Sequence, residues 1–225
     1  MVKRRKYETG KILLEVSRDV NSSMDPDEVS KLMKNLFLST LTSLTREIDA
    51  KDSYTSGHSE RVMKYTVAIG RELALDKEAL ENLRLASLLH DIGKIGVRES
   101  ILMKPAKLLG YERRQIKMHP SIGARIIESM EDSDIIRRGI LEHHERYDGK
   151  GYPNHLKGDQ ISIEGRIIAV ADVFDALTTD RPYQKGYSKE EVFRKIQEEA
   201  SAQFDPQIVT AFVASYKSYP DIWCK

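Results

Sequence analysis

Apolar positions in this chain recur at helical spacing, and no segment alternates apolar and polar residues as a half-buried strand does. The pattern predicts a first helix over residues 11–18 and a long amphipathic helix that begins at Asp25-Pro26 and reaches Ile48. An aspartate followed by proline favours a helix start, because the side chain caps the free backbone amides and the ring fits the first turn. Further helices are predicted over residues 56–73, 77–92, 111–117, 120–130, 134–144, 164–178, 189–199 and 206–217.

Residues 146–165 break the helical pattern. This stretch contains Gly149, Gly151, Pro153, Gly158 and Gly165. A loop of this length inside a domain is usually functional or disordered. The sequence therefore predicts an all-α domain over residues 44–225 with one long glycine-rich loop. Residues 1–43 are predicted to be a helical linker or signalling segment, whose long helix either packs as an ordinary helix or mediates a homodimer.

Composition excludes some classes of partner. The chain has 36 Lys and Arg against 35 Asp and Glu among its 225 residues, so no net field favours a nucleic acid polymer. Its apolar stretches are too short to span a bilayer. A single cysteine, Cys224, cannot form an internal disulfide. These features predict a cytoplasmic protein, alone or as part of a longer sensor chain.

Two pairs of neighbouring metal-binding side chains stand at the ends of predicted helices. His90-Asp91 closes an apolar helix, and His143-His144 closes another. Adjacent helical residues point about 100° apart, so both can reach one buried point only near a helix end or bend. Each feature has an ordinary alternative: a buried His–Asp hydrogen bond for the first pair, and a core histidine for His58, which lies on the inward stripe of its helix.

Further candidate ligands lie elsewhere in the chain. His119 precedes Pro120 at the start of a predicted helix, and Asp172 lies in the most apolar stretch, where an ionised carboxylate needs a cation. The candidate set has nitrogen and oxygen donors and no thiolate, which suits two six-coordinate ions and favours Fe or Mn over Zn, Ni or Mg. Its members are His58, His90, Asp91, His119, His143, His144 and Asp172.

Together these motifs resemble the HD-GYP family, a branch of the HD phosphohydrolase superfamily that hydrolyses the bacterial messenger cyclic di-GMP. The resemblance covers about residues 44–214. It is carried by HDIGKIG at 90–96, HP at 119–120, HHERYDGKGYP at 143–153 and ADVFDALT at 171–178. It implies an HD-domain helical bundle with a GYP loop, in which the seven candidate residues bind two divalent metal ions.

The resemblance also implies substrate contacts. Lys94 would bind a phosphate, with a role at the helix end dipole as its alternative. Arg181 would bind the second phosphate or form a surface salt bridge, and Tyr183 would stack on guanine. Tyr152, in the GYP loop, would pack on the domain or contact substrate or a partner protein.

Two positions depart from the family pattern. Tyr54 stands where some members have a glutamate ligand, which favours two ions over three. Gln184 follows the Arg-Pro-Tyr motif where many members have a basic residue. The predicted reaction is hydrolysis of cyclic di-GMP to pGpG, and then to GMP, by a hydroxide that the two ions share beside Asp91. The alternatives are an HD hydrolase for another cyclic dinucleotide or nucleotide, and a non-catalytic module that binds cyclic di-GMP or a protein.

Overall fold

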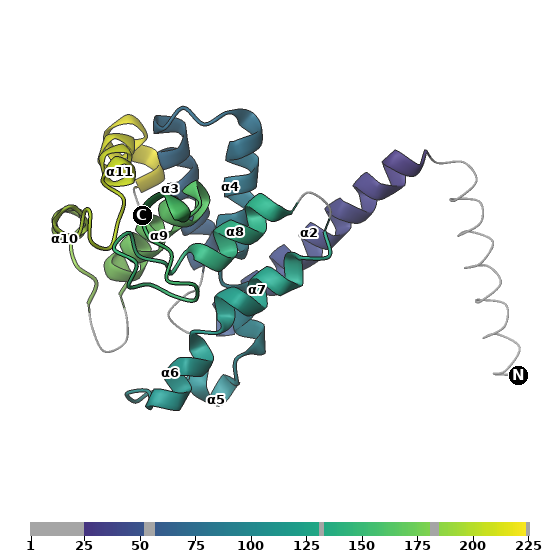
Figure 1. Cartoon of the computed structure of the whole chain (residues 1–225), viewed down its shortest axis with the longest axis horizontal. Helices are drawn as coiled ribbons and strands as arrows, with labels where there is room; N and C mark the ends of the chain where they lie inside the picture. The colour runs from purple at the N-terminus through teal and green to yellow at the C-terminus, as the bar shows by residue number, and fades with distance from the viewer. Residues whose placement is uncertain (1–24, 52–56, 131–132, 181–184, 224–225) are drawn as a thin grey trace, which may run out of the picture. The chain divides into compact units, whose positions relative to one another are not determined.

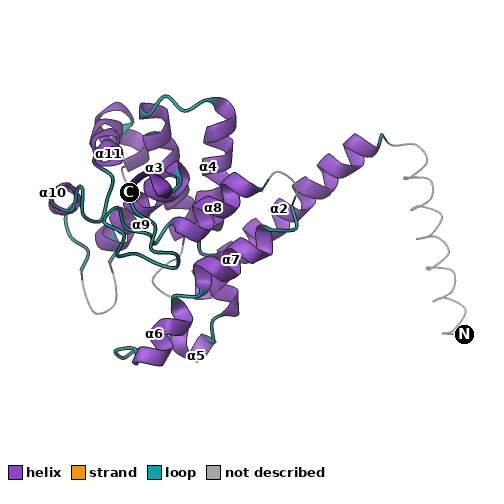
Figure 2. Ribbon diagram, viewed as in Figure 1, coloured by secondary structure: helices purple, strands orange, loops and turns teal. Residues whose placement is uncertain are grey.

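A computed structural model of the chain describes residues 25–51, 57–130, 133–180 and 185–223. The chain divides into two compact units, residues 1–40 and residues 41–225. In the described residues every regular element is a helix, and the only β feature is an isolated bridge between Ala200 and Phe204 (Figures 1 and 2). The predicted all-α fold is therefore confirmed, while the predicted boundary near residue 44 stays a prediction. No helix within the described ranges is long and apolar enough to cross a membrane.

The long predicted helix is α2, Pro26–Lys51. The Asp25 carboxylate accepts a hydrogen bond from the Asp27 amide at 3.1 Å, as expected of the predicted helix start. In the first unit, α2 exposes Leu32 and Leu36. From Leu41 onward the helix belongs to the second unit. The predicted helix over 11–18 lies outside the described residues.

The second unit continues with short helices of 3 to 16 residues. Four of them, α5, α12 and the two 3-10 turns, have no counterpart in the predicted set, because elements this short show no periodicity. In order the elements are α3 His58–Glu72, α4 Lys77–Leu89, η1 Ile92–Gly96, α5 Glu99–Leu102, α6 Gly110–Ile116, α7 His119–Ile127, α8 Asp134–Glu142, η2 Gly158–Gln160, α9 Ile163–Thr178, α10 Lys189–Glu198, α11 Pro206–Ser218 and α12 Pro220–Trp223.

Helix α9 lies at the centre of this unit and contacts α3, α4, α8, α10 and α11 (Figure 1). Because neighbours surround it, Ile167, Val170 and Phe174 are all fully buried. This burial explains why the segment reads as the most apolar in the sequence. The same helix carries Asp172 and Asp175 into the interior.

The backbones of η1 and α7 touch at Gly93. A Cβ atom at this position would lie 1.9 Å from the carbonyl oxygen of His119 and 2.5 Å from the amide nitrogen of Gly123. Helix α4 ends at Leu89, three residues before the predicted end, so the chain turns at His90 and brings η1 against α7. This close approach requires glycine and places two histidine-bearing segments side by side.

The C-terminal helix α12 closes the core. Trp223 is fully buried, and its ring stacks on Tyr65 of α3 at a centroid distance of 4.5 Å and an interplanar angle of 7°. Its indole nitrogen donates a hydrogen bond to the Ser215 carbonyl of α11 at 3.2 Å. Trp223 therefore fastens the last helix to α3 and α11.

Candidate metal centre

Three histidines lie just past the C-terminal ends of helices and hydrogen-bond to them. His90 follows α4, His119 follows α6 and His143 follows α8. In each, the Nδ1–H group donates to the carbonyl three residues earlier, which a helix end leaves without a partner. The acceptors are the carbonyls of Ser87, Ile116 and Ile140, at 2.7, 2.8 and 2.7 Å. A carbonyl can only accept, so Nδ1 carries the hydrogen and Nε2 of the neutral ring carries a lone pair.

The first group of candidate ligands consists of His119, His143 and His144, whose donor atoms lie within 4.8 Å of one another. The Nε2 atoms of His119 and His143 face each other at 3.2 Å. Burial holds the pKa of His119 below and that of His143 well below its ordinary value, and lowers the pKa of His144 to about 4. All three rings are therefore neutral at pH 7. Two lone pairs that face each other at this distance call for a cation between them, so these residues fit a divalent metal ion.

The second group consists of His58, His90 and Asp172, also within 4.8 Å of one another. The Nε2 atom of His58 lies 3.3 Å from an oxygen of Asp172 and 3.3 Å from Nε2 of His90. Burial acts to lower the pKa of His58, but hydrogen bonds to the Asp172 and Asp175 carboxylates raise it to about 10. The centre thus favours positive charge at this point, and a divalent ion supplies it.

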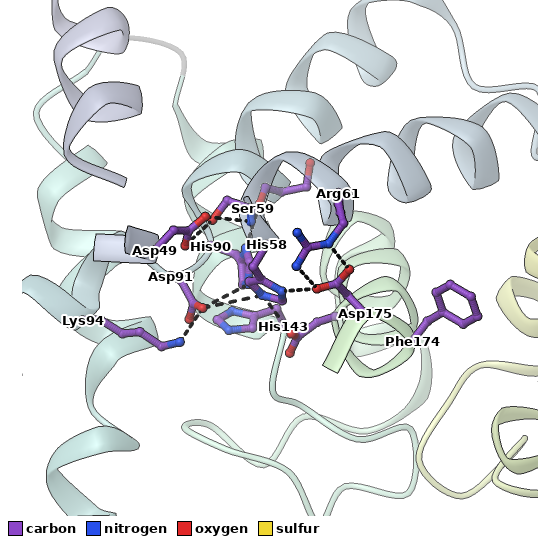
Figure 3. Close-up of polar contacts among 12 residues, drawn as sticks. Asp49, His58, Ser59, Arg61, His90, Asp91, Lys94, His143, Phe174 and Asp175 are labelled. Atoms are coloured by element: carbon purple, nitrogen blue, oxygen red, sulfur yellow. Dashed lines mark hydrogen bonds and ion pairs between the residues drawn. The ribbon is translucent and has the colours of Figure 1, made fainter. Parts of the chain in front are cut away.

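Asp91 lies close to ligands of both groups, and Figure 3 shows it beside His90 and Lys94. Its Oδ1 atom is 3.3 Å from Nε2 of His119, and its Oδ2 atom is 3.4 Å from Nε2 of His90. Lys94 donates a hydrogen bond to Oδ2 at 2.6 Å. Burial acts to raise the pKa of Asp91, but the charge of the Lys94 ammonium holds it well below its usual range. An ionised carboxylate therefore presents one oxygen to each group, which is the arrangement of a bridging ligand.

Side chains outside the ligand set hold these ligands in place. Asp175 accepts a hydrogen bond from Nδ1 of His58 at 2.8 Å and one from Nε of Arg61 at 2.7 Å (Figure 3). Glu142, which precedes His143, accepts hydrogen bonds from Arg138 and from the backbone of the glycine-rich loop and so does not contact a histidine through these bonds. The role of Arg61 was not predicted, although Arg61 lies three residues after His58 and therefore on the same face of α3.

A second supporting contact comes from α2. The Asp49 carboxylate accepts hydrogen bonds from the amide and the hydroxyl of Ser59 at 2.9 and 3.1 Å (Figure 3). This bond lies at the N-terminal turn of α3, directly beside His58, so it fixes the end of the helix that carries this ligand. This contact could not be predicted from the sequence, because the hydrogen-bond donor Ser59 lies on a different helix from Asp49.

The glycine-rich loop folds back over the first group. Buried Glu145 accepts hydrogen bonds from the amides of Asn154 and Leu156 at 2.6 and 3.1 Å. Gly151 packs so tightly that an added Cβ would lie 2.3 Å from the Arg146 amide nitrogen. The result is a stack of the Tyr152 ring on the His144 ring, with centroids 4.8 Å apart. Tyr152 thus packs on a candidate ligand, one of its predicted roles.

A cavity of about 250 Å³ lies beside this stack. Its wall includes metal-centre residues, the glycine-rich loop and three cationic side chains. The residues that line it include the candidate ligands His143, His144 and Asp172, Tyr152 of the loop, and the cations Lys117, Arg146 and Lys150. The cavity therefore leads from the surface to the candidate ligands.

The structure brings all seven predicted ligands together, from α3, α7, α9 and the turns after α4 and α8. Lys94 and Tyr152 also lie at the centre. The predicted substrate residues Arg181 and Tyr183 lie outside the described residues, as do Tyr54 and Gln184. The roles of the site residues in binding metal and substrate stay predictions.

The profile of the HD domain family matches residues 42–208. A Pseudomonas aeruginosa protein named cyclic di-GMP phosphodiesterase is 42% identical over 181 residues, which are 80% of this chain and 43% of the relative. A Vibrio cholerae protein named 3'3'-cGAMP-specific phosphodiesterase 3 is 39% identical over 181 residues, covering 80% of this chain and 39% of the relative. The chain thus spans less than half the length of these curated relatives.

Solved structures show the same helical fold. A Vibrio cholerae cyclic GMP-AMP-specific phosphodiesterase superposes with a TM-score of 0.63 at 22% identity, covering 83% of this chain and 50% of that one. A Bdellovibrio bacteriovorus protein described as an HD-GYP-type protein gives a TM-score of 0.60 at 18% identity, covering 89% of this chain and 67% of that one. In agreement with the predicted resemblance, the chain belongs to the HD domain family.

Proposed function

We propose that this domain is a metal-dependent phosphodiesterase that hydrolyses cyclic di-GMP to pGpG and, in a second round, to GMP. The observation that carries the proposal is Asp91, which presents one carboxylate oxygen to each of two neighbouring groups of ligands. A shared carboxylate between two such groups is suited to a pair of divalent ions, as used in phosphodiester hydrolysis. The relative from Pseudomonas aeruginosa named for this activity supports the substrate.

The first group, His119, His143 and His144, would hold one ion, and the second group, His58, His90 and Asp172, the other. All donors are imidazole nitrogens or carboxylate oxygens, which favours Fe or Mn over Zn, Ni or Mg. Bound divalent ions supply Lewis acidity toward a phosphoryl oxygen and lower the pKa of water for attack at neutral pH.

The protein's own groups position the substrate and stabilise charge. The Lys94 ammonium lies 2.6 Å from Oδ2 of Asp91, so it can also donate to a phosphoryl oxygen that gains negative charge in the transition state. Asp175 keeps the His58 ring oriented toward the second group. In this proposal Tyr152, Arg181 and Tyr183 contact the rest of the substrate.

The test is anaerobic purification, metal quantitation and cyclic di-GMP hydrolysis with Fe, Mn and Zn compared. We expect about two ions per chain and formation of pGpG. Replacing Asp91 with alanine should abolish both metal loading and turnover, since both groups lose their shared oxygen donor. Replacing Asp134, an exposed aspartate on α8, with alanine is the matched control and should change neither. If wild-type protein binds both ions but hydrolyses no cyclic dinucleotide, the proposed enzymatic activity is excluded and the domain is a binding module.

A second candidate substrate is a mixed cyclic dinucleotide. Its support is the Vibrio cholerae relative named as specific for 3'3'-cGAMP, which is 39% identical to this chain. Measuring kcat/KM for cyclic di-GMP and 3'3'-cGAMP side by side decides between the two substrates. A ratio that favours 3'3'-cGAMP would replace the first candidate by the second.

We also infer that the domain works in the cytoplasm as one part of a sensor chain. Exposed Leu32, Met33 and Leu36 on α2 support a homodimer through that helix, which light scattering of the chain and a Leu36→Lys variant would test. Exposed Asn154 and His155 in the GYP loop support a protein partner there.

A further inference from the structure

Lys117 occupies an unusual position between α6 and the metal centre. Its ammonium nitrogen lies 4.6 Å from the centroid of the Tyr152 ring, within the range of a cation–π contact. The Tyr152 ring in turn stacks on His144, one of the candidate ligands. Lys117 is exposed and lines the cavity, so its charge faces both solvent and the path to the ions.

The other cations at this site already have acidic partners. Arg146 pairs with Asp148 at 3.1 Å, Lys150 lies 3.9 Å from the same carboxylate, and Lys94 pairs with Asp91. Among the described residues, by contrast, no carboxylate lies within 4.0 Å of the Lys117 ammonium. An aromatic face fixes the position of an ammonium group without neutralising its charge. Lys117 is therefore the cation of the cavity wall best placed to receive an anion.

The size of the cavity indicates which anion. At about 250 Å³ it is smaller than the ~300–1,000 Å³ typical of small-molecule pockets, so it encloses only part of a cyclic dinucleotide. The cleaved phosphate must reach the two groups of ligands beside Asp91. The other phosphate of the ring then lies away from the ions and needs a cation from the protein.

We propose that Lys117 binds the phosphate that is not cleaved, and so selects substrates that carry two phosphates in one ring. The proposal rests on the function proposed above. The Lys117 ammonium has three N–H groups, so it can donate a hydrogen bond to a phosphate oxygen while it stays over the face of the Tyr152 ring. Arg181, which the family resemblance assigns to this phosphate, would act in addition to Lys117.

The experiment compares a substrate that has the second phosphate with one that lacks it. Lys117→Met removes the charge and keeps the length of the side chain, and Lys117→Arg keeps the charge. Lys64→Met, at an exposed lysine of α3 away from the cavity, is the matched control. Hydrolysis of cyclic di-GMP and of bis(p-nitrophenyl) phosphate, a diester with a single phosphate, is measured together with metal content and cyclic di-GMP affinity by calorimetry.

For Lys117→Met we expect KM and Kd for cyclic di-GMP to rise about tenfold, as for the loss of one charge-assisted hydrogen bond. Metal content and hydrolysis of bis(p-nitrophenyl) phosphate should stay unchanged, and Lys117→Arg should restore most of the affinity. The dependence of Kd on salt should also become weaker, because one screened ionic contact is gone.

Two results would overturn the proposal. One is a Lys117→Met enzyme that binds cyclic di-GMP as tightly as the Lys64→Met control. The other is an equal loss on both substrates with loss of metal, which would reduce Lys117 to a support for the Tyr152 stack. Wild-type protein that neither binds nor hydrolyses cyclic di-GMP would instead refute the proposed function, and this inference with it.

Discussion

Replacing Gly93 with alanine tests the contact between η1 and α7 on which the metal centre depends. The new Cβ atom would lie 1.9 Å from the His119 carbonyl oxygen and 2.5 Å from the Gly123 amide nitrogen. Both neighbours are backbone atoms, so no side-chain rotation can relieve the overlap. The two segments must separate by about 1 Å to reach the shortest contacts seen in folded proteins.

The magnitude of the effect follows from this separation. Overpacking a core typically costs about 1–3 kcal/mol, and a clash with two backbone atoms of α7 belongs at the upper end of that range. In a domain of this size, about 3 kcal/mol corresponds to a fall in Tm of roughly 6–12 °C. The 3.3 Å distance between His119 and Asp91 would change as well, and ligand distances tolerate only about 0.2 Å.

The assay is thermal unfolding with and without Mn²⁺, together with metal quantitation. We expect Gly93→Ala to lower Tm and to lose the ion held by the first group of ligands. Gly110→Ala is the matched control, because the nearest atom to its Cβ, in the flexible Arg114 side chain, lies 3.8 Å away. Gly96→Ala, whose Cβ meets only the Ile122 side chain at 2.9 Å, should be intermediate. A Gly93→Ala protein with the Tm and metal content of the Gly110→Ala control would refute the close packing of η1 on α7.

Three further changes test other parts of the structure. Trp223→Ala should lower the free energy of unfolding by about 3–5 kcal/mol in urea titrations, since it empties a fully buried site; a loss under 1 kcal/mol would contradict that burial. Asp175→Asn should weaken Mn²⁺ binding about 10–100-fold by calorimetry, because the His58 ring loses its charged partner. Unchanged affinity would mean that the ring is oriented by other contacts. Glu145→Gln should speed proteolysis of the glycine-rich loop and lower kcat/KM while metal content is kept, because two backbone amides lose a charged acceptor. Equal proteolysis of variant and wild type would show that the loop is held by other contacts.

Much of this architecture could be predicted from the sequence. Helical periodicity located the longer helices, and Asp25-Pro26 located the start of α2, because these signals are local. The seven candidate ligands could be collected because histidines and aspartates in apolar surroundings are costly without a partner. Their adjacency in pairs at helix ends indicated a shared point, and the turn at His90 and Asp91 agrees with that interpretation.

The remaining contacts depend on tertiary structure. The stacking of Tyr152 on His144 and the approach of Lys117 to Tyr152 join segments that no periodicity connects. The sequence shows a glycine at position 93, but it does not show that this glycine packs against α7. Arg61 of α3 and Asp175 of α9 are 114 residues apart in the chain, so these two charged side chains meet only once the helices have packed.

The Nδ1–H groups of His90, His119 and His143 donate to carbonyls at helix ends, so metal binding at these rings would be coupled to helix fraying. An ion bound at Nε2 would also immobilise the last turns of α4, α6 and α8, which otherwise open most readily. Bound metal should therefore slow amide hydrogen exchange in these turns more than in the middle of the same helices. The ions would thus act as a stabilising ligand of the folded state, and withdrawing them would loosen three helix ends at once.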